Sequence, residues 1–497
     1  MKIIMSEKVL SFPIKLSLVI LWVLMLAGLC FAQPAISLSR PGGPPTTQLR
    51  VSGSGFTAYA EIDIYFDTKD EALAIANSAG SFSNIAIKAP ASALPGTHWV
   101  SAVQRSNHTG GQSPFWVHTN WYQAGFAPDH TEQNPFENVL NPTTVGRLKL
   151  SWSYPSSGTP SVVQNEIYFG SGNTIYALKA NGQPAWQYTA GGSVANGVAV
   201  ADGKLYAGSG DYKIFALSAQ TGNLLWQYKT GSYVVSPPVV ADGVVYAGSD
   251  DDSVYALNAA TGHLIWKYTT GGPVQFAPSV LNGIVYIGSA DGNLYAVSAA
   301  AGTLVWSYTT TPNNNLSTPT LANGVVYVAS ADNNLYALNS SNGNLLWKFN
   351  LGAPSDGSSA AVANGVVYVG SGDAGIFYAV NGNSGALLWK YTTAVPVYSA
   401  SAVANGVVYF GAGDGNFYAL DASSGKLLWR YTTGGYFPSG VVTNGKVYLS
   451  ADVFRVFGIA GGDVAKQFPA QDNAQTEPPD MKALHPDYKL QIVGNSE

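Results

Sequence analysis

The chain has 497 residues, enough for more than one domain and for a large hydrophobic core. It contains 55 Gly, 27 Pro, 29 Tyr and 12 Trp but only 11% charged residues, which favours an all-β protein over a helical one. The net charge of −5 is spread along the chain without a basic stripe, so the composition argues against a partner that is a nucleic acid.

Residues 1–32 have the organisation of a signal peptide. Three lysines precede an apolar run over residues 16–32, and cleavage before Gln33 would place small residues at positions −1 and −3. Two alternatives stay open: an uncleaved signal anchor, and a lipid anchor on Cys30, for which the bulky Leu29 is a poor predecessor. We expect a secreted or extracytoplasmic protein of the cell envelope, with no transmembrane span in the mature chain.

Cys30 is the only cysteine of the chain. Removal of the leader would leave no thiol. Disulfides, thiolate metal sites and a cysteine nucleophile would then all be excluded.

Residues 34–119 predict a small β-sandwich. A Gly-rich turn is followed by segments in which apolar and polar positions alternate, as in half-buried strands. These segments are residues 61–67, 84–90, 98–104 and 114–119. The length and pattern predict an immunoglobulin-like (Ig-like) domain, and the segment resembles the small Ig-like modules of bacterial surface proteins.

Residues 120–143 are polar and aromatic, with three Pro and no period. We interpret them as a packed linker that fixes the two domains. The alternative is a contact surface for a partner.

The remaining two-thirds of the chain is self-similar, and a fixed period of this length decides the architecture. Each repeat has four parts: an apolar strand, a strand typified by VVYAGS, a strand typified by LYALN, and LLWKYTT. The tryptophans of the fourth part recur every 40 to 42 residues, at positions 186, 226, 266, 306, 347, 389 and 429. Four antiparallel strands per unit of about 40 residues describe one blade of a β-propeller.

Two sets of turns support this prediction. Asn-Gly or Asp-Gly pairs such as Asp202-Gly203 separate strands one and two, where they supply the positive φ values of two-residue hairpins. A second set, such as Thr221-Gly222, joins strands three and four. Its glycine precedes the tryptophan by four residues in all seven repeats.

The strand count predicts ring closure. The second and third strands occur eight times each, whereas the tryptophan strand follows its own third strand only seven times. An unassigned strand of that type surrounds Trp152, upstream of the first repeat. We therefore predict an eight-bladed propeller over residues 144–462, closed by the strand at Trp152, which removes an exposed sheet edge. Residues 463–497 contain no repeat and are expected to form a flexible tail.

The repeats resemble those of the pyrroloquinoline-quinone (PQQ)-like propeller family. The segments ALSAQTGNLLW (216–226) and ALDASSGKLLW (419–429) resemble its tryptophan-docking motif, although the motif's acidic position is kept only as Asp421. The resemblance implies an eight-bladed ring with each tryptophan packed between neighbouring blades. Its members include quinone-dependent dehydrogenases and non-enzymatic scaffolds such as the BamB-type propellers of outer-membrane assembly.

The repeat region is poor in the residues that catalysis needs. The resemblance implies that quinone dehydrogenases use a catalytic Asp, acidic calcium ligands including a Glu, and commonly a vicinal cysteine pair. Between Leu148 and Ala460 there is one Glu, Glu166, and one His, His263. We interpret Glu166 as a residue of the turn between strands one and two, and His263 as a variable, solvated turn position.

Six aspartates lie five residues after a second-strand tyrosine, and one interpretation covers them all. We expect each carboxylate to accept hydrogen bonds from nearby backbone amides in the turn between strands two and three. The six are Asp211, Asp251, Asp291, Asp332, Asp373 and Asp414. An alternative is a calcium site at Asp250-Asp251-Asp252, where three adjacent carboxylates could share a hard cation.

These observations predict no catalytic, cofactor-binding or metal-binding residue. We expect a non-catalytic, monomeric binding or scaffold protein that presents its propeller to a protein or other ligand of the cell envelope. One alternative is a PQQ-dependent dehydrogenase, or a degenerate relative, that binds the quinone with calcium in the central channel. A second alternative is a BamB-like role in outer-membrane protein assembly.

Overall fold

The computed structural model describes residues 33–459 except 196, 356 and 394. The predicted signal peptide and tail lie outside the described residues. The described chain is built of strands, with one short 3-10 helix, η1 (Val145–Arg147). It divides into two compact units, which comprise residues 33–91 with 97–116, and residues 92–96 with 117–459. Within the described ranges, no helix has the length and apolar character needed to cross a membrane.

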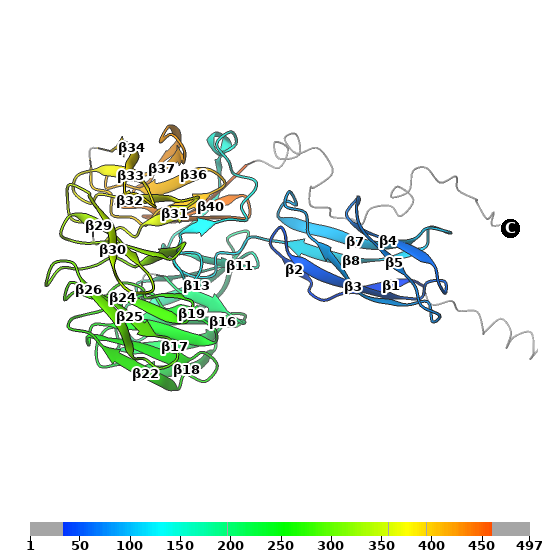
Figure 1. Ribbon diagram of the computed structural model, residues 1–497, viewed down its shortest axis with the longest axis horizontal. Helices are drawn as coiled ribbons and strands as arrows, with labels where there is room; N and C mark the ends of the chain where they lie inside the picture. Colours follow the sequence, from blue (N-terminus) through cyan, green and yellow to red (C-terminus); the bar gives the residue numbers. More distant parts are fainter. Residues whose placement is uncertain (1–32, 196, 356, 394, 460–497) are drawn as a thin grey trace, which may run out of the picture. The chain divides into compact units, whose positions relative to one another are not determined.

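The first unit contains two antiparallel sheets (Figure 1). The strands of one sheet are β1 (Ala35–Leu38), β3 (Gln48–Ser54) and β6 (Phe82–Lys88). The strands of the other are β2 (Gly42–Gly43), β8 (Gly110–Val117), β7 (Gly96–Gln104), β4 (Glu61–Phe66) and β5 (Lys69–Ile75). Apolar residues such as Val51, Ile62 and Ile64 are fully buried, and β4 is buried on both faces, since Asp63 and Tyr65 are buried too.

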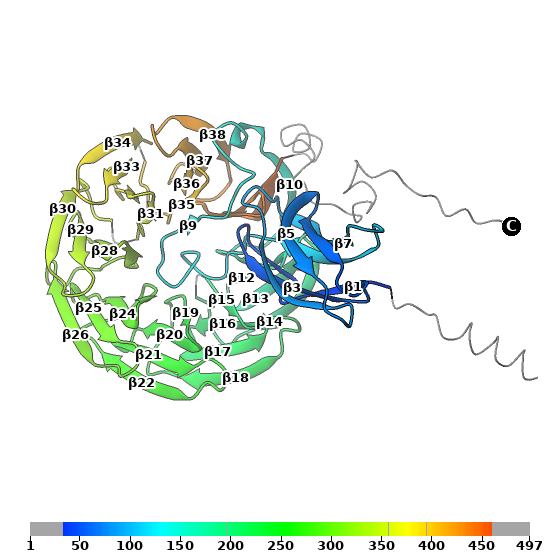
Figure 2. The same cartoon turned by 45° about the vertical axis from the view of Figure 1, so that its right-hand side comes forward.

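The second unit is a β-propeller whose sheets follow one another around a ring (Figure 2). Seven sheets each contain four strands from one continuous part of the chain. In each of them the strands follow one another from the inside of the ring outward. Their strands are β11 (Ser161–Val163), β12 (Glu166–Ser171), β13 (Thr174–Lys179) and β14 (Pro184–Thr189); β15 (Ala199–Ala201), β16 (Lys204–Ser209), β17 (Lys213–Ser218) and β18 (Leu224–Lys229); β19 (Val239–Ala241), β20 (Val244–Ser249), β21 (Ser253–Asn258) and β22 (Leu264–Thr269); β23 (Ser279–Leu281), β24 (Ile284–Gly288), β25 (Asn293–Ser298) and β26 (Leu304–Thr309); β27 (Thr320–Ala322), β28 (Val325–Ala329), β29 (Asn334–Asn339) and β30 (Leu345–Asn350); β31 (Ala361–Ala363), β32 (Val366–Gly370), β33 (Ile376–Asn381) and β34 (Leu387–Thr392); β35 (Ala402–Ala404), β36 (Val407–Gly411), β37 (Asn416–Asp421) and β38 (Leu427–Thr432). The short strand β9 (Gln133–Asn134) adds to the seventh of these sheets, parallel to β35.

The last sheet joins the two ends of the propeller. Its strands are β39 (Ser439–Thr443), β40 (Lys446–Ser450), β41 (Phe454–Gly458) and β10 (Lys149–Tyr154). The strand β10 pairs with β41, with Trp152 opposite Val456, as predicted for the strand that carries Trp152. One buried cluster contains Val162 from the first sheet together with Tyr448 and Phe457 from the last, so the hydrophobic core continues across this junction.

Each sheet carries the same row of three residues across its outer strands. The second-strand tyrosine lies opposite a third-strand alanine, which in turn lies opposite the fourth-strand tryptophan, as in Tyr206, Ala216 and Trp226. Because the central residue is small, the two rings approach across it to a centroid distance of 5.9 Å. The last sheet has the same row with Val456 in place of the alanine.

The tryptophans connect neighbouring sheets, as the resemblance to PQQ-like repeats implied. Each indole Nε1 of the seven from Trp152 to Trp389 donates to a backbone carbonyl of the next sheet, at 2.8–3.1 Å. The glycine of the next sheet's last turn packs against the same indole ring. A Cβ at Gly222, for example, would lie 2.6 Å from Cε3 of Trp186. A positive φ of 73° and this close approach both require glycine there.

Trp429 is the exception because the last sheet has no turn between a third and a fourth strand. Its ring packs edge-on against Phe457 at 5.3 Å. The buried Glu137 lies in the same part of the ring. One carboxylate oxygen accepts from the N–H groups of Val139 and Leu140, and the other from that of Gly445. The segment that leads into β10 contacts the neighbouring sheet as well, because η1 lies against β38, the strand that carries Trp429.

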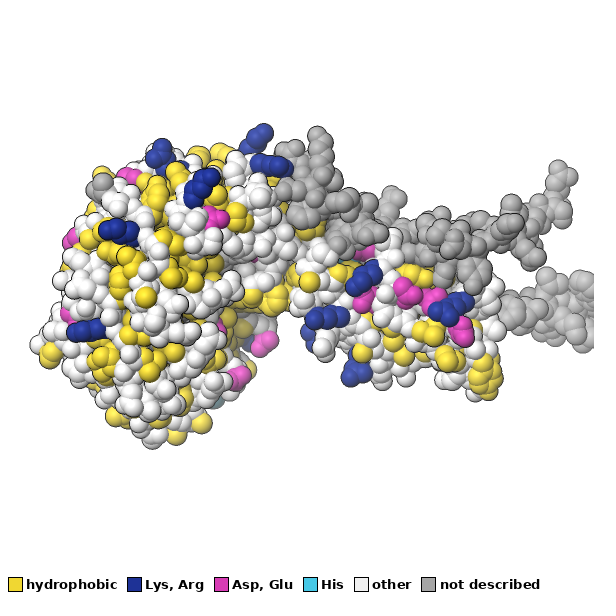
Figure 3. All heavy atoms as spheres, turned by 45° about the horizontal axis from the view of Figure 1, so that its top comes forward, with side chains coloured by type: hydrophobic (Ala, Val, Ile, Leu, Met, Phe, Trp, Pro, Cys, Tyr) yellow, Lys and Arg dark blue, Asp and Glu magenta, His cyan; other side chains and the backbone are white. Residues whose placement is uncertain are grey.

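The outermost strands expose leucines in a regular row. Leu225 and Leu346 are 48% and 50% exposed, and a lysine follows each tryptophan in β22, β30 and β34. Figure 3 shows exposed hydrophobic side chains on this unit with lysine and arginine side chains among them. Charged side chains on edge strands disfavour edge-to-edge pairing with other chains.

Candidate functional site

The segment Thr119–Asn134, here called the inner strap, runs around the inside of the ring. In six successive sheets it offers a backbone or side-chain oxygen to the N–H group of the middle residue of the first strand, at 2.7–3.0 Å. These pairs are Tyr122 to Val200, Gln123 to Val240, Pro128 to Val280, Asp129 to Leu321, Thr131 to Val362, and Glu132 to Val403. Trp121 pairs with Val162 of the first sheet in both directions.

Both ends of the strap contact the last sheet, so the strap runs once around the inside of the ring. At its start, the Thr119 N–H donates to Asn444 Oδ1 at 2.7 Å, and at its end Asn134 Nδ2 donates to the Val442 carbonyl at 2.9 Å. Figure 2 shows this segment inside the ring, next to β19, β31 and β35. It supplies the hydrogen bonds that the inner edges of the sheets lack.

The strap also folds on itself inside the ring. The Glu132 N–H donates to the carbonyl of Gly125, and Trp121 packs edge-on against Phe126 at 5.2 Å. Trp121 and His130 are each only 1% exposed. Strap residues therefore occupy part of the interior of the ring at the level of the first strands. The predicted linker over residues 120–143 thus contains most of the strap, whose hydrogen bonds to eight separate sheets leave no period along the chain.

Burial of the strap shifts the titration of two of its side chains. Burial lowers the pKa of His130 to about 4, which keeps the imidazole neutral at neutral pH. Burial likewise raises the pKa of Glu132 to about 8. At neutral pH both side chains are therefore mainly uncharged, and they place polar groups but no ionic charge inside the ring.

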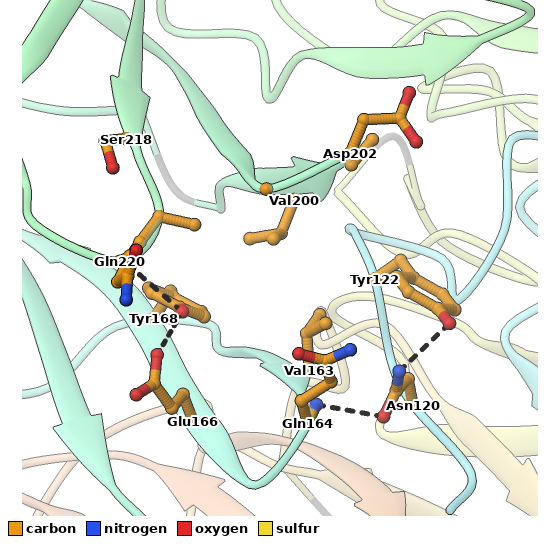
Figure 4. A pocket seen from close by; sticks show the side chains of 13 residues that line it. Asn120, Tyr122, Val163, Gln164, Glu166, Tyr168, Val200, Asp202, Ser218 and Gln220 are labelled. Atoms are coloured by element: carbon orange, nitrogen blue, oxygen red, sulfur yellow. Dashed lines mark hydrogen bonds between the residues drawn. The ribbon is translucent and has the colours of Figure 1, made fainter. Parts of the chain in front are cut away.

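A polar groove lies where the strap meets the first and second sheets (Figure 4). Its volume is about 660 Å³. The strap contributes Asn120 and Tyr122, the first sheet contributes Gln164, Glu166 and Tyr168, and the second contributes Asp202 and Gln220. The side chains of Asn120 and Tyr122 are joined by a hydrogen bond of 2.9 Å, and Asn120 Oδ1 also accepts from the Gln164 N–H.

Glu166 lies one position later than predicted, and this corrects its interpretation as a turn residue. The left-handed turn positions are Gln164 and Asn165, with φ of 52° and 64°, and Glu166 is the first residue of β12. Its carboxylate Oε2 accepts from the Tyr168 hydroxyl at 2.5 Å. The carboxylate therefore stands on the groove wall (Figure 4). The first hairpin lacks the usual glycine, which hid the register from a sequence comparison.

The other candidate residues lie outside the groove. His263 is exposed in a turn, as predicted. Asp251 accepts hydrogen bonds from the Gly231 N–H and the Tyr255 hydroxyl, and Asp250 accepts from Gln275 Nε2 at 3.2 Å. Across residues 33–459, gaps excepted, no group of three or more His, Cys, Asp or Glu side chains is arranged to hold a metal. The residues at 250–252 thus do not form the calcium site considered above.

The repeated aspartates have structural roles. Asp291 Oδ2 accepts from the Tyr295 hydroxyl at 2.6 Å and from the Gly271 N–H at 2.9 Å, and Asp291 Oδ1 accepts from the Asn293 N–H. Gly271 follows the outer strand of the preceding sheet, so this carboxylate connects two sheets. Burial raises the pKa of Asp291, but the hydrogen bonds from Tyr295 and Asn293 outweigh it and hold the pKa below its ordinary value. The predicted bonds from nearby backbone amides are confirmed for Asp291, Asp332 and Asp414, and Asp251 accepts from the Gly231 N–H of the preceding sheet. Asp211 accepts instead from Lys213 Nζ, and Asp373 from the Tyr398 hydroxyl.

The strap residues of the groove were not predicted from the sequence. Asn120 and Tyr122 carry no motif, and they reach the groove only because the strap pairs with the ring. One signal was present: Glu166 is the single glutamate of the repeat region.

Comparison with known proteins relates the propeller to two groups. The model of the family described as outer membrane protein assembly factor BamB matches residues 171–281, 270–356 and 331–471. The quinohemoprotein alcohol dehydrogenase ADH-IIG of Pseudomonas putida is 34% identical over 122 residues, which are 21% of this chain and 17% of that protein. The alignments with three such curated relatives span only 16–18% of the relatives' length.

Solved structures show the same fold. A europium-containing methanol dehydrogenase superposes with a TM-score of 0.60 at 18% identity, covering 67% of this chain and 89% of that one. BamB from Moraxella catarrhalis superposes with a TM-score of 0.56 at 22% identity, covering 63% of this chain and 99% of that one. At these identities the likeness shows the fold alone.

Proposed function

Because the chain belongs to the family described as outer membrane protein assembly factor BamB, we propose that it is a non-catalytic, extracytoplasmic binding protein. Its closed eight-bladed propeller presents surface turns and the groove at the first two sheets to a protein partner of the cell envelope. An Ig-like first domain would serve as a spacer or as a second binding module. A BamB-like role in outer-membrane protein assembly is the specific form of this function that the family favours.

The observation that carries the proposal is the inner strap. A quinone cofactor bound in the central channel would need open space with polar groups facing it. At the level of the first strands, that space holds Trp121, Phe126 and His130 of the chain itself. Displacing the strap would break hydrogen bonds to the inner strands of the sheets and leave buried N–H groups unpaired, which is costly.

The residues present do not fit PQQ and calcium. Calcium in proteins takes six to eight oxygen ligands, commonly several carboxylates, and within the described residues no such cluster occurs. A vicinal cysteine pair is ruled out by composition, since the chain has one cysteine.

A quinone-dependent dehydrogenase remains the second candidate, on one observation. Short stretches of the chain are 30–36% identical to quinone-dependent or lanthanide-dependent alcohol and methanol dehydrogenases. Those stretches cover 18–21% of this chain. They support shared repeats more directly than a shared active site.

Two measurements on the full-length protein test the proposal. The first incubates it with PQQ and either calcium or a lanthanide, and then assays dye-linked oxidation of methanol and ethanol and retention of PQQ absorbance after gel filtration. We expect neither turnover nor retained PQQ, and turnover with stoichiometric PQQ would establish the dehydrogenase instead. A quinohemoprotein dehydrogenase serves as the positive control.

The second measurement captures partners from the native cell envelope after reversible crosslinking. We expect one protein to be enriched stoichiometrically and to bind the purified chain again when it is itself purified. Failure of every enriched protein to rebind would contradict a partner-binding role.

A further inference from the structure

We propose that the groove between the first two sheets binds a positively charged side chain, lysine or arginine, presented by the protein partner. This inference rests on the proposed function and names the chemistry of that partner. Three features support it: a break in the repeat at Glu166, the negative charge of the groove and its aromatic wall.

The repeat is broken at Glu166. The equivalent first position of the second strand is Lys204, Val244, Ile284, Val325, Val366, Val407 or Lys446 in the other sheets. A carboxylate occurs there only in the first sheet, beside the groove. Stability of the propeller does not require it, because seven sheets form the same strand with other residues.

Glu166 also alters a hydrogen bond that the tyrosines of four other sheets make, Tyr206, Tyr286, Tyr327 and Tyr368. The second-strand tyrosine hydroxyl donates to a carbonyl of the next sheet at 3.1 Å from Tyr206 and 3.0 Å from Tyr286. In the first sheet, the corresponding distance from Tyr168 to the Ala219 carbonyl is 3.3 Å, while Glu166 Oε2 lies 2.5 Å from the hydroxyl. A phenol has one proton to donate, so Tyr168 holds the carboxylate in place on the wall.

The groove carries negative charge without a compensating cation in its lining. Of the 13 residues that line it, Glu166 and Asp202 are the carboxylates, and none is Lys, Arg or His. A guanidinium or ammonium group that reached both walls would form charge-assisted hydrogen bonds with these oxygens. Exposed amide side chains at Gln164 and Gln220 supply further acceptors.

Tyr122 gives the groove an aromatic wall. Its side chain is 44% exposed, although the strap on either side of it is buried. Cations favour the faces of such rings. A volume of about 660 Å³ accommodates a long side chain together with part of its backbone.

A second groove, at the third and fourth sheets, can be compared with the first. The strap meets the third and fourth sheets in a hollow of about 370 Å³ that contains Asp129 and Asp242. Its lining has no aromatic residue and no glutamate. Both grooves thus carry carboxylates, but only the first combines them with an aromatic ring and a larger space.

The test measures binding of a fluorescein-labelled hexa-arginine peptide to the full-length protein by fluorescence anisotropy, with a hexa-glutamate peptide as the negative probe. The variant Glu166→Gln/Asp202→Asn keeps the shape of the groove and removes its charge. Asn suits position 202 because Asp202 has a φ of 48°, a left-handed conformation that Asn tolerates. We expect about tenfold weaker binding.

A charge-matched control is Asp250→Asn/Asp252→Asn, at the other end of a second strand. It should bind within about twofold of the unchanged protein. A second variant, Tyr122→Leu, should weaken binding about threefold through loss of the aromatic face. Thermal unfolding by circular dichroism identifies any variant that fails to fold.

Equal weakening by both double variants, or no change in Glu166→Gln/Asp202→Asn, would overturn the inference. The partner captured from the envelope separates this failure from failure of the proposed function. If a captured partner binds Glu166→Gln/Asp202→Asn as tightly as the unchanged protein, the groove is not its binding site. The proposed function as a binding protein is still supported in that case.

Discussion

At the residue scale, single carbonyls and carboxylates hold neighbouring sheets together. The Ala219 carbonyl accepts from Trp186 of the preceding sheet, and Asp291 accepts from Gly271 of the preceding sheet. Ala219 lies in the turn between the third and fourth strands of its sheet, and Asp291 lies in the turn between the second and third strands of its sheet. These turns are at opposite ends of the strands. The interfaces of the third sheet with its two neighbours have both kinds of contact, and these contacts are open to single substitutions.

Asp291→Asn should lower the free energy of unfolding by ~1–2 kcal/mol at neutral pH, because it removes charge-assisted hydrogen bonds. The folded-state pKa of Asp291 is lowered, so its contribution is present above the ordinary aspartate pKa and is lost as pH falls through the folded value. Urea denaturation at neutral pH and at about pH 3 checks this. Asp250→Asn is the control, and an equal loss at both pH values would contradict the ionic role.

Glu132→Gln should stabilise the protein at alkaline pH. Because burial raises the folded-state pKa to about 8, the folded protein keeps a proton that the unfolded chain releases, and stability falls as pH rises toward that value. A Gln at position 132 does not ionise, so its burial does not depend on pH. We therefore expect the free energy of unfolding to rise by ~2 kcal/mol near pH 9 and to change little near pH 5.

Glu137→Gln is the matched control for this experiment. The Glu137 carboxylate uses both oxygens to accept from three backbone N–H groups, which an amide with one oxygen cannot do. It should therefore destabilise the protein at both pH values. A loss of stability in Glu132→Gln near pH 9 would contradict the assignment of a buried, protonated Glu132.

At the element scale, each sheet from the second to the seventh has two glycine turns with different demands. The first turn needs positive φ alone. A Cβ at Gly243, with a φ of 76°, would meet nothing within 4 Å. The last turn needs positive φ and space for the preceding tryptophan, as at Gly222. The two glycines look alike in sequence and differ in what surrounds them.

Gly222→Ala should therefore cost more than Gly243→Ala. The change at position 243 introduces only left-handed backbone strain, about 1 kcal/mol. The change at position 222 adds a methyl group 2.6 Å from the Trp186 ring, for a total of ~2–4 kcal/mol. The midpoints of urea denaturation compare the two, and equal midpoints would show that the indole moves aside freely.

Strands and turns were predictable where the repeat made eight examples comparable. The hairpins at Asp202-Gly203 and its equivalents, the tryptophan strands and the pairing of Trp152 with the last sheet are all confirmed. Glu166 was misplaced by one position because its turn, Gln164-Asn165, has no glycine to mark it. The strap could not be predicted, since its contacts are one or two hydrogen bonds per sheet, most of them from the backbone, to sheets up to about 300 residues away, and they leave no repeating side-chain pattern.

At the scale of the whole molecule, the strap turns separate sheets into one assembly. Repeat proteins without such a segment are stabilised mainly by contacts between neighbours. Here one stretch of chain also contacts each sheet from the inside. We expect the propeller to unfold as a single unit, because the loss of one sheet would disturb the strap at all the others.

Amide hydrogen exchange followed by mass spectrometry tests this expectation. The N–H groups of Val200, Val280 and Val403 donate to strap carbonyls and should exchange as slowly as the central strands of their sheets. Peptides covering residues 119–134 should be equally protected. Rapid exchange of these peptides under native conditions would show that the strap leaves the ring readily.

Closure by β10 has a consequence for how the molecule is made. The strand Lys149–Tyr154 leaves the ribosome early, whereas its partner Phe454–Gly458 is among the last described parts to be synthesised. Until then β10 lacks its partner, and the growing protein cannot finish its circle. Premature termination anywhere in the repeats would thus yield an arc with two unpaired ends, a species prone to self-association and a natural substrate for proteases that remove incomplete chains.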